Sequence, residues 1–231
     1  MSPNNSPTKD RKLVIVGDSA FAEVAFEYFS RDSRYEVAAF AVEAAFLKRV
    51  TLMGLPVVPF ESLAERFSPG DHDVYVAIVY SQMNRLRTRL AAAAKAAGFG
   101  LASYVSRHAF VWPNVKLGEH CFIFENNVVQ PFVKIGDNVV LWSGNHIGHH
   151  SRIDDNVFFS SHVVVSGFCE IGASCFLGVN VSVANNVTIA KDCWIGPGVV
   201  ISQATKEGEL YRSPTSEVAK VGALRFFRVK E

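Results

Sequence analysis

Apolar side chains recur at every sixth residue from Val105 to Ile201, with no insertion between them. These positions hold valine, leucine or isoleucine, except that one holds Phe159. An α-helix cannot keep a strict six-residue stripe on one face, and the turns of an ordinary hairpin sheet fall at irregular spacing. A parallel β-helix with one short strand in each hexad accounts for the pattern. The sequence therefore predicts such a β-helix over residues 105–202.

Two other positions of the repeat indicate how each coil is built. Four residues after each apolar position comes a mostly small side chain, and this position holds all four cysteines: Cys121, Cys169, Cys175 and Cys193. We expect them to be reduced fillers of the interior, not metal ligands or disulfide partners, and we expect no metal site. Three residues after each apolar position come mainly Asn, Asp and Gly, which tolerate positive φ at a corner. This corner position also holds four histidines: His108, His120, His150 and His162.

His149, like His146, departs from the corner rule, because it lies two residues after Ile147. If three hexads make one coil, residues 18 apart stack at about 4.8 Å, and Gly167 is 18 residues after His149. An imidazole would then lie one layer from a backbone N–H that no side chain obstructs. A general base and a free amide are what acyl transfer needs, since the amide stabilises the oxyanion. A solvated histidine on the outside of a solid prism is the alternative.

Residues 12–104 alternate short apolar runs with helical patterns, which predicts a parallel sheet covered by helices. We expect strands over 13–16, 35–42, 74–80 and 101–105, and a long helix over 82–97. Basic residues on that helix are expected to form a solvated face: Arg85, Arg87, Arg89 and Lys95.

Composition excludes several classes of partner. Lys and Arg number 23 against 22 Asp and Glu, so no strong field of one sign attracts nucleic acid or anionic lipid. Residues 1–11 are polar and are expected to be disordered, with the character of neither a signal peptide nor an anchor. No apolar run is long enough to span a membrane. We therefore expect a cytoplasmic protein.

The segment from His146 to Ile201 resembles the core of bacterial sugar acyltransferases of the sialic-acid O-acetyltransferase and bacillosamine-pathway N-acetyltransferase type. The resemblance extends to the α/β part. It implies a Rossmann-like domain that binds a sugar nucleotide, then a left-handed β-helix, and a homotrimer that binds acetyl-CoA between neighbouring prisms. It also implies that His149 is the catalytic base and that Gly167 supplies the oxyanion hole. The bacillosamine-pathway enzyme has a glutamate where this chain has His150.

The resemblance implies further site residues. Contacts with coenzyme A are expected from Gly167, Gly178, Val179, Gly196 and Pro197. Contacts with the nucleotide are expected from Gly17, Ser19, Ala20 and Glu43. The family's Gly-His-Gly turn is replaced by Gly17-Asp18-Ser19, and the C-terminal tail, residues 203–231, has only Arg212-Ser213-Pro214-Thr215 in place of an Asn-Pro-Ala-Lys-like motif.

These features together predict an acetyl-CoA-dependent N-acetyltransferase that acts on a nucleotide-linked amino sugar of a bacterial surface glycan. Two alternatives remain, O-acetylation of a sugar or sialic acid without a nucleotide, and a binding or scaffold protein that has lost catalysis. We also expect an exposed apolar exterior that forms the trimer interface, made by Phe122, Phe124, Trp142, Phe158 and Trp194.

Overall fold

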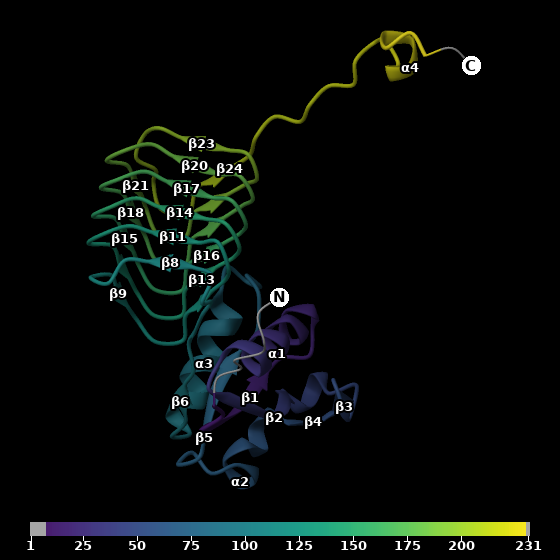
Figure 1. Cartoon of the computed structure of the whole chain (residues 1–231), viewed down its shortest axis with the longest axis vertical. Coiled ribbons are helices and arrows are strands. Elements are labelled where there is room, and N and C mark those ends of the chain that lie inside the picture. The colour runs from purple at the N-terminus through teal and green to yellow at the C-terminus, as the bar shows by residue number, and fades with distance from the viewer. Residues whose placement is uncertain (1–7, 230–231) are drawn as a thin grey trace.

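The structure is a computed structural model and describes residues 8–229. It has an α/β part followed by a stacked β-helix, and residues 212–229 extend away from the body (Figure 1). Residues 1–7 of the segment expected to be disordered lie outside the described residues. Arg11, the last residue of that segment, is instead the first residue of a strand.

The α/β part is built on one sheet with the strand order β3-β4-β2-β1-β5-β6. Its strands are β1 (Arg11–Val16), β2 (Tyr35–Val42), β3 (Thr51–Leu52), β4 (Leu55–Pro59), β5 (His72–Val76) and β6 (Gly100–Leu101). All neighbours are parallel except β3 and β4. Its helices are α1 (Ala20–Asp32), η1 (Ala44–Phe46), η2 (Phe60–Ser62), α2 (Leu63–Arg66) and α3 (Arg85–Ala96). The parallel sheet expected from the strand–helix alternation is confirmed.

Three predicted boundaries in the α/β part are wrong. The strand expected to reach Tyr80 ends at Val76, and the following helix begins at Arg85. Gln82, Met83 and Asn84 have positive φ, so they form a turn that cannot belong to the helix. The strand expected over 101–105 is two short strands in different sheets, β6 and β7 (Tyr104–Val105). The chain passes from the α/β part to the β-helix between them.

The β-helix has three sheets, one on each face of a prism. The first contains β7, β10 (Phe122–Ile123), β13 (Val140–Leu141), β16 (Phe158–Phe159), β19 (Phe176–Leu177), β22 (Trp194–Ile195) and β24 (Leu210–Tyr211). The second contains β8 (Phe110–Val111), β11 (Val128–Val129), β14 (His146–Ile147), β17 (Val164–Val165), β20 (Ser182–Val183) and β23 (Val200–Ile201). The third contains β9 (Lys116–Leu117), β12 (Lys134–Ile135), β15 (Arg152–Ile153), β18 (Glu170–Ile171) and β21 (Thr188–Ile189). We call them the first, second and third faces.

The register confirms one coil per 18 residues, since His146 pairs with Val164 and Val164 with Ser182. The prism is longer than predicted, because β24 pairs with β22 and therefore adds residues of the expected tail. The remaining tail, which includes Arg212–Thr215, leads to the short helix α4 (Ala223–Phe226) at a distance from the prism (Figure 1).

The interior of the prism is filled as the repeat predicts. From Ile123 on, its core contains the apolar repeat residues and the fillers that follow them, and it includes all four cysteines, each 0% exposed and free. Val105 and Leu117 in the first coil are exposed instead. Burial raises the pKa of Cys121 and Cys175 to about 12, so these thiols stay protonated and unreactive. Positive φ occurs at the predicted corners from His120 to Gly198. Among the described residues, two predicted corners in the first coil, His108 and Asn114, do not have positive φ.

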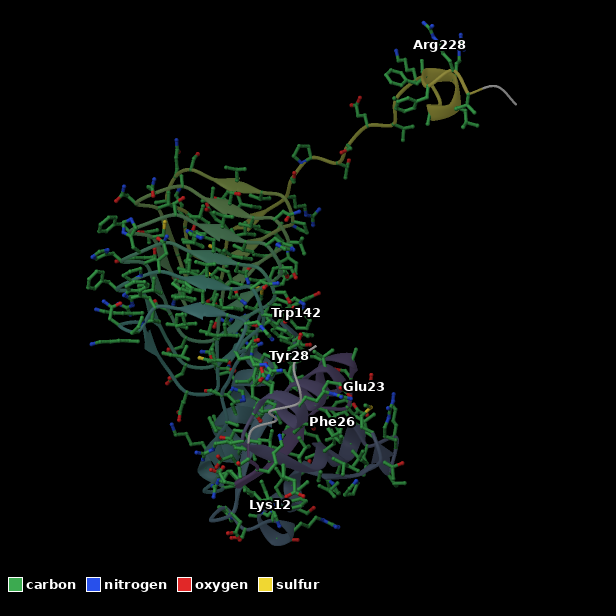
Figure 2. All side chains as sticks on the ribbon, in the orientation of Figure 1. Lys12, Glu23, Phe26, Tyr28, Trp142 and Arg228 are labelled. Carbon is green, nitrogen blue, oxygen red and sulfur yellow. The ribbon has the colours of Figure 1, made fainter. Side chains whose placement is uncertain are left out.

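The first face of the prism packs against the α/β part, and this overturns the expectation that its aromatic residues are exposed. Phe122, Phe124 and Phe158 are at most 3% exposed, in one cluster with residues of α1 and β5. Trp142 packs on Phe21 at the start of α1, with ring centroids 5.3 Å apart. Tyr28 of α1 and Trp142 mark this junction in Figure 2. Phe122, Phe124 and Phe158 therefore join two parts of one chain and are too buried to form an interface between copies. Trp142 and Trp194 are half-buried and pack against the same cluster.

A buried polar network also crosses the junction. Arg87, expected on a solvated face, is fully buried, and it donates through Nε to Asn138 Oδ1 at 2.8 Å and through Nη1 to the carbonyl of Ile78. The N–H of Val76 donates to Nε2 of His120, whose Nδ1 therefore carries the proton and donates to Asn138 Oδ1. Burial lowers the pKa of His120 to about 3, which keeps this ring neutral.

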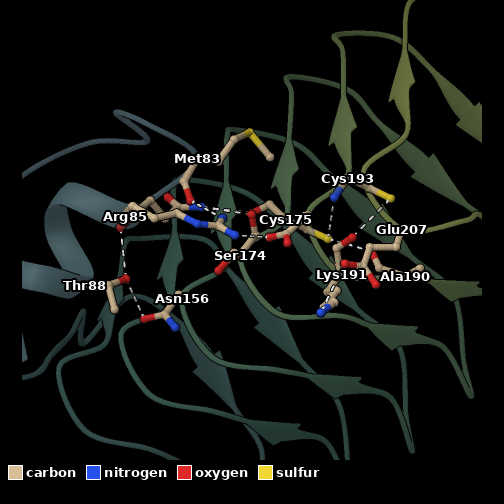
Figure 3. Close-up of polar contacts among 12 residues, drawn as sticks. Met83, Arg85, Thr88, Asn156, Ser174, Cys175, Ala190, Lys191, Cys193 and Glu207 are labelled. Carbon is tan, nitrogen blue, oxygen red and sulfur yellow. Dashed lines mark hydrogen bonds and ion pairs between the residues drawn. The ribbon is translucent and has the colours of Figure 1, made fainter.

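A second set of contacts joins α3 to later coils. Thr88 Oγ1 donates to Asn156 Oδ1 at 2.9 Å, as Figure 3 shows. Arg85 pairs with Asp192 at 2.5 Å. Polar contacts from α3 to several coils therefore hold this helix along the prism.

Candidate active site

His149 is the second residue after β14, at the corner between the second and third faces, and its side chain is exposed. Its backbone N–H donates to Gln130 Oε1 at 2.9 Å. A Cβ placed on Gly167 would come within 2.9 Å of Cε1 and 3.0 Å of Nε2 of the His149 ring. The imidazole therefore lies directly on Gly167, and a larger residue there would displace it. The stacking that the 18-residue spacing predicts is present.

His150 occupies the adjacent corner position with φ +58°, as its place in the repeat predicts. Its ring is stacked between Phe132 and Phe168, with centroid distances of 4.5 and 4.9 Å. Nδ1 of His150 lies 3.1 Å from Nδ1 of His149. One of these nitrogens must donate and the other accept. When Nδ1 of His149 donates, Nδ1 of His150 accepts, and Nε2 of His149 is left with a lone pair over Gly167. This tautomer of His149 can work as a base.

The backbone amide of Gly167 is not free, contrary to the expectation. No side chain of its own obstructs the N–H, but the N–H donates to Oδ1 of Asn185 at 2.9 Å. Asn185 lies 18 residues further on, one coil away, and its side chain is exposed. The amide is therefore occupied in this structure by a side chain that the sequence interpretation missed.

The expected coenzyme A residues lie at a different corner from His149. Gly178 and Val179 follow β19, and Gly196 and Pro197 follow β22, so all four lie between the first and second faces. A Cβ on Gly178 would approach the backbone N of Pro197 to 2.7 Å, which explains this glycine by the packing of coils alone. Gly196 is similarly close to the carbonyl of Tyr211. Of the five expected residues, Gly167 alone lies beside His149.

A cavity of about 200 Å³ lies at this same corner. It opens between the loop after β5, with Val79 and Tyr80, and the prism, with Trp142, Ser161 and Val179. Apolar and hydroxyl side chains therefore meet where the α/β part faces the prism.

The turn after β1 holds the other expected residues. Gly17 has φ +125°, and a Cβ there would lie 2.9 Å from the carbonyl of Ala77. Ser19 is the N-cap of α1 and Ala20 its first residue. β1 lies between β2 and β5 in the sheet. The chain continues from β1 to the strands on its β2 side and later returns to add β5 and β6 on its other side. Open α/β sheets bind ligands at such a switch point, beside a helix N-terminus that attracts phosphate.

Two charges near this turn are already paired. Asp18, which would repel a phosphate, lies 3.5 Å from Arg49. Both oxygens of Glu43 accept from Arg89 at 2.9 Å, and this bond lowers the pKa of Glu43. Glu43 is therefore ionised and held at the carboxyl end of β2.

No helix of residues 8–229 is long and apolar enough to cross a membrane. Within the same part of the chain, no cluster of three His, Cys, Asp or Glu side chains is arranged to hold a metal.

Comparison with known proteins agrees with this architecture. The family model for bacterial transferase hexapeptide repeats matches residues 114–145, 132–167 and 168–203. No curated protein sequence matches the chain. Among solved structures, perosamine N-acetyltransferase from Caulobacter crescentus, in complex with CoA and GDP-perosamine, is 27% identical over 86% of this chain and 92% of that one, with a TM-score of 0.78.

Two further structures share the fold. The acetyltransferase domain of PglB from Neisseria gonorrhoeae is 24% identical, with a TM-score of 0.78, over 87% of this chain and 95% of that one. WeeI from Acinetobacter baumannii is 15% identical, with a TM-score of 0.51, over 83% of this chain and 94% of that one.

The repeats, the prism and the likeness to the Caulobacter enzyme define an acyltransferase with a left-handed hexapeptide-repeat β-helix. That likeness covers 86% of this chain, so it extends over the α/β part as well as the prism. The fold and the enzyme class expected from the sequence are both confirmed.

Proposed function

We propose that this chain transfers an acetyl group from acetyl-CoA to the amino group of a nucleotide-linked amino sugar in the synthesis of a bacterial surface glycan. The placement of the His149 imidazole directly on Gly167 carries the proposal. Support comes from the Caulobacter enzyme, which has the same two-part fold and was solved with CoA and GDP-perosamine. Both proposed substrates are made in the cytoplasm, so the reaction is assigned to that compartment.

Each residue at the His149 corner has a role in this reaction. Acetyl-CoA would supply the thioester that reacts. His149 Nε2 accepts a proton from the acceptor amine as the nitrogen attacks, and returns it to the departing thiolate. The Gly167 N–H donates to the carbonyl oxygen on which negative charge develops. His150, held between two phenyl rings, orients the His149 ring through Nδ1.

The α/β part binds the acceptor's nucleotide in this proposal. Backbone amides of Ser19 and Ala20, next to Gly17, are available to a diphosphate at the N-terminus of α1, and Arg49 offsets the charge of Asp18. In this proposal Glu43, at the end of β2, contacts the ribose or base. In the same proposal the arm of coenzyme A passes the corner of Gly178, Val179, Gly196 and Pro197, where Val179 and Pro197 are exposed.

Calorimetric titration tests the nucleotide site. We expect binding heat with at least one of the uridine, thymidine, guanosine and cytidine diphosphosugars, and its loss in Ser19→Glu, which adds a negative charge at the helix N-terminus. Ser62→Glu, at the start of a different helix, is the matched control and should bind normally. Silence from all four nucleotides would favour O-acetylation of a sugar or sialic acid without a nucleotide.

We propose that the site is shared between copies of the chain. The start of α1 packs on the first face through Phe21, and Val179 lies between the first and second faces, whereas His149 lies across the second face. The strands of the second face present mostly apolar side chains to the outside: Phe110, Val128, His146, Val164, Ser182 and Val200. Those of the third face are polar: Lys116, Lys134, Arg152, Glu170 and Thr188. We therefore place the interface on the second face, in a homotrimer as the family resemblance implies.

Light scattering tests this assembly. The wild type should have three times the 25.4 kDa mass of the chain, and Val164→Glu should dissociate it by burying a charge in an apolar interface. Thr188→Glu makes the equivalent change on the third face and should leave the trimer intact. A monomer of the wild type at micromolar concentration would contradict the proposal.

A further inference from the structure

The amide that the proposed reaction uses is closed in this structure. Asn185 stacks one coil from Gly167, and its Oδ1 accepts the Gly167 N–H at 2.9 Å. The orientation of the side-chain amide follows from chemistry, because a backbone N–H requires an oxygen acceptor. The His149 ring packs against the same glycine. The side-chain carbonyl of Asn185 thus accepts the Gly167 N–H beside the His149 ring.

Elsewhere in the prism the same contact closes amides that have no proposed part in chemistry. The N–H of Glu119 donates to Asp137 Oδ1, and the N–H of Asp137 donates to Asp155 Oδ1, each at 2.8 Å and each 18 residues apart. These residues lie at the corner between the third and first faces. The fold therefore caps free corner amides with a carbonyl or carboxylate from the next coil. At Gly167 the cap is neutral and therefore easier to displace than a carboxylate.

We propose that Asn185 is a gate on the Gly167 amide that opens when the acyl group of the donor arrives and stays closed over free coenzyme A. Its Oδ1 stands where the thioester oxygen must accept the Gly167 N–H, so the side chain has to rotate away when the acyl group arrives. Asn185 is exposed, and water can satisfy it after rotation. Free coenzyme A has no acyl carbonyl to replace Oδ1, so the gate stays closed when coenzyme A is bound and closes again after transfer, and the affinity for coenzyme A does not depend on Asn185. This inference rests on the proposed function.

The gate is tested by measuring how tightly acetyl-CoA and free coenzyme A bind to the wild type and to three variants. Asn185→Ala removes the competing acceptor and should strengthen acetyl-CoA binding about twofold to tenfold, the range of one neutral hydrogen bond, without changing the binding of coenzyme A. Asn185→Asp keeps the acceptor and adds charge, so it should weaken acetyl-CoA binding by a similar factor. Asp137→Ala opens a cap far from His149 and should change neither affinity.

The acetyl-CoA-to-CoA affinity ratio is the readout that a purely structural role would not move. Exchange of the Gly167 amide hydrogen, followed by NMR without ligand, should accelerate in Asn185→Ala. Equal effects on both ligands, or no effect, would overturn the gate while leaving the acyltransferase proposal standing. Failure of the wild type to bind acetyl-CoA at all would instead overturn the proposed function.

Discussion

Replacing His149 with alanine should lower kcat by roughly 10² to 10⁴, the usual contribution of a general base. His150 cannot simply replace it, because its ring is held between Phe132 and Phe168. The fold should survive, because the His149 side chain is exposed and the prism core does not include it. Steady-state kinetics with a thermal unfolding curve for each variant measures both effects.

The neighbouring histidines provide the controls. His150→Asn suits the positive φ of its corner and should keep the fold, with a smaller loss of kcat than His149→Ala. If His150 orients His149, the double variant should lose less than the two single losses combined, because the second change removes a partner already gone. His162→Asn makes the same change at the same repeat position, with φ +59°, on the corner between the first and second faces, and should keep the fold without the coupling to His149. Near wild-type kcat in His149→Ala would refute its assignment as the base.

The prism could be predicted because its repeat is a local property of the sequence. Each apolar repeat residue has one possible direction, into the core, and each filler and corner follows at a fixed offset. The same spacing stacks His149 on Gly167, so this part of the site could be predicted without knowing handedness. The residue 18 positions after Gly167 is Asn185, which stacks on it in the next coil. The spacing that predicts this contact was present in the sequence, but the interpretation missed it.

The surroundings of the prism could not be predicted in the same way. The repeat shows which side chains point outward but not what covers them, and so Phe122 and Phe158 were expected to meet another copy. They meet the α/β part instead, through contacts that join residues distant in sequence. Arg87 was misjudged for the same reason. Its burial depends on Asn138 and on backbone carbonyls that a helical pattern does not show.

Nucleotide-linked amino sugars should be acetylated far faster than the same sugars without the nucleotide. Binding energy from the nucleotide, held by the α/β part, fixes the amine against His149 and the thioester. Losing that positioning should lower kcat/KM by about 10²-fold or more. The difference should appear in kcat as well as in KM, because misplacement affects the reacting atoms and not only binding.

Release of free thiol from acetyl-CoA, measured against a panel of nucleotide-linked amino sugars and their nucleotide-free counterparts, tests the central claim most directly. We predict turnover with at least one nucleotide-linked amine and an acetylated product that survives hydroxylamine, as an amide does and an ester does not. A hydroxylamine-sensitive product would show an O-acetyltransferase. Absence of turnover with every acceptor, from protein that is folded and trimeric, would contradict catalysis and leave a binding or scaffold protein.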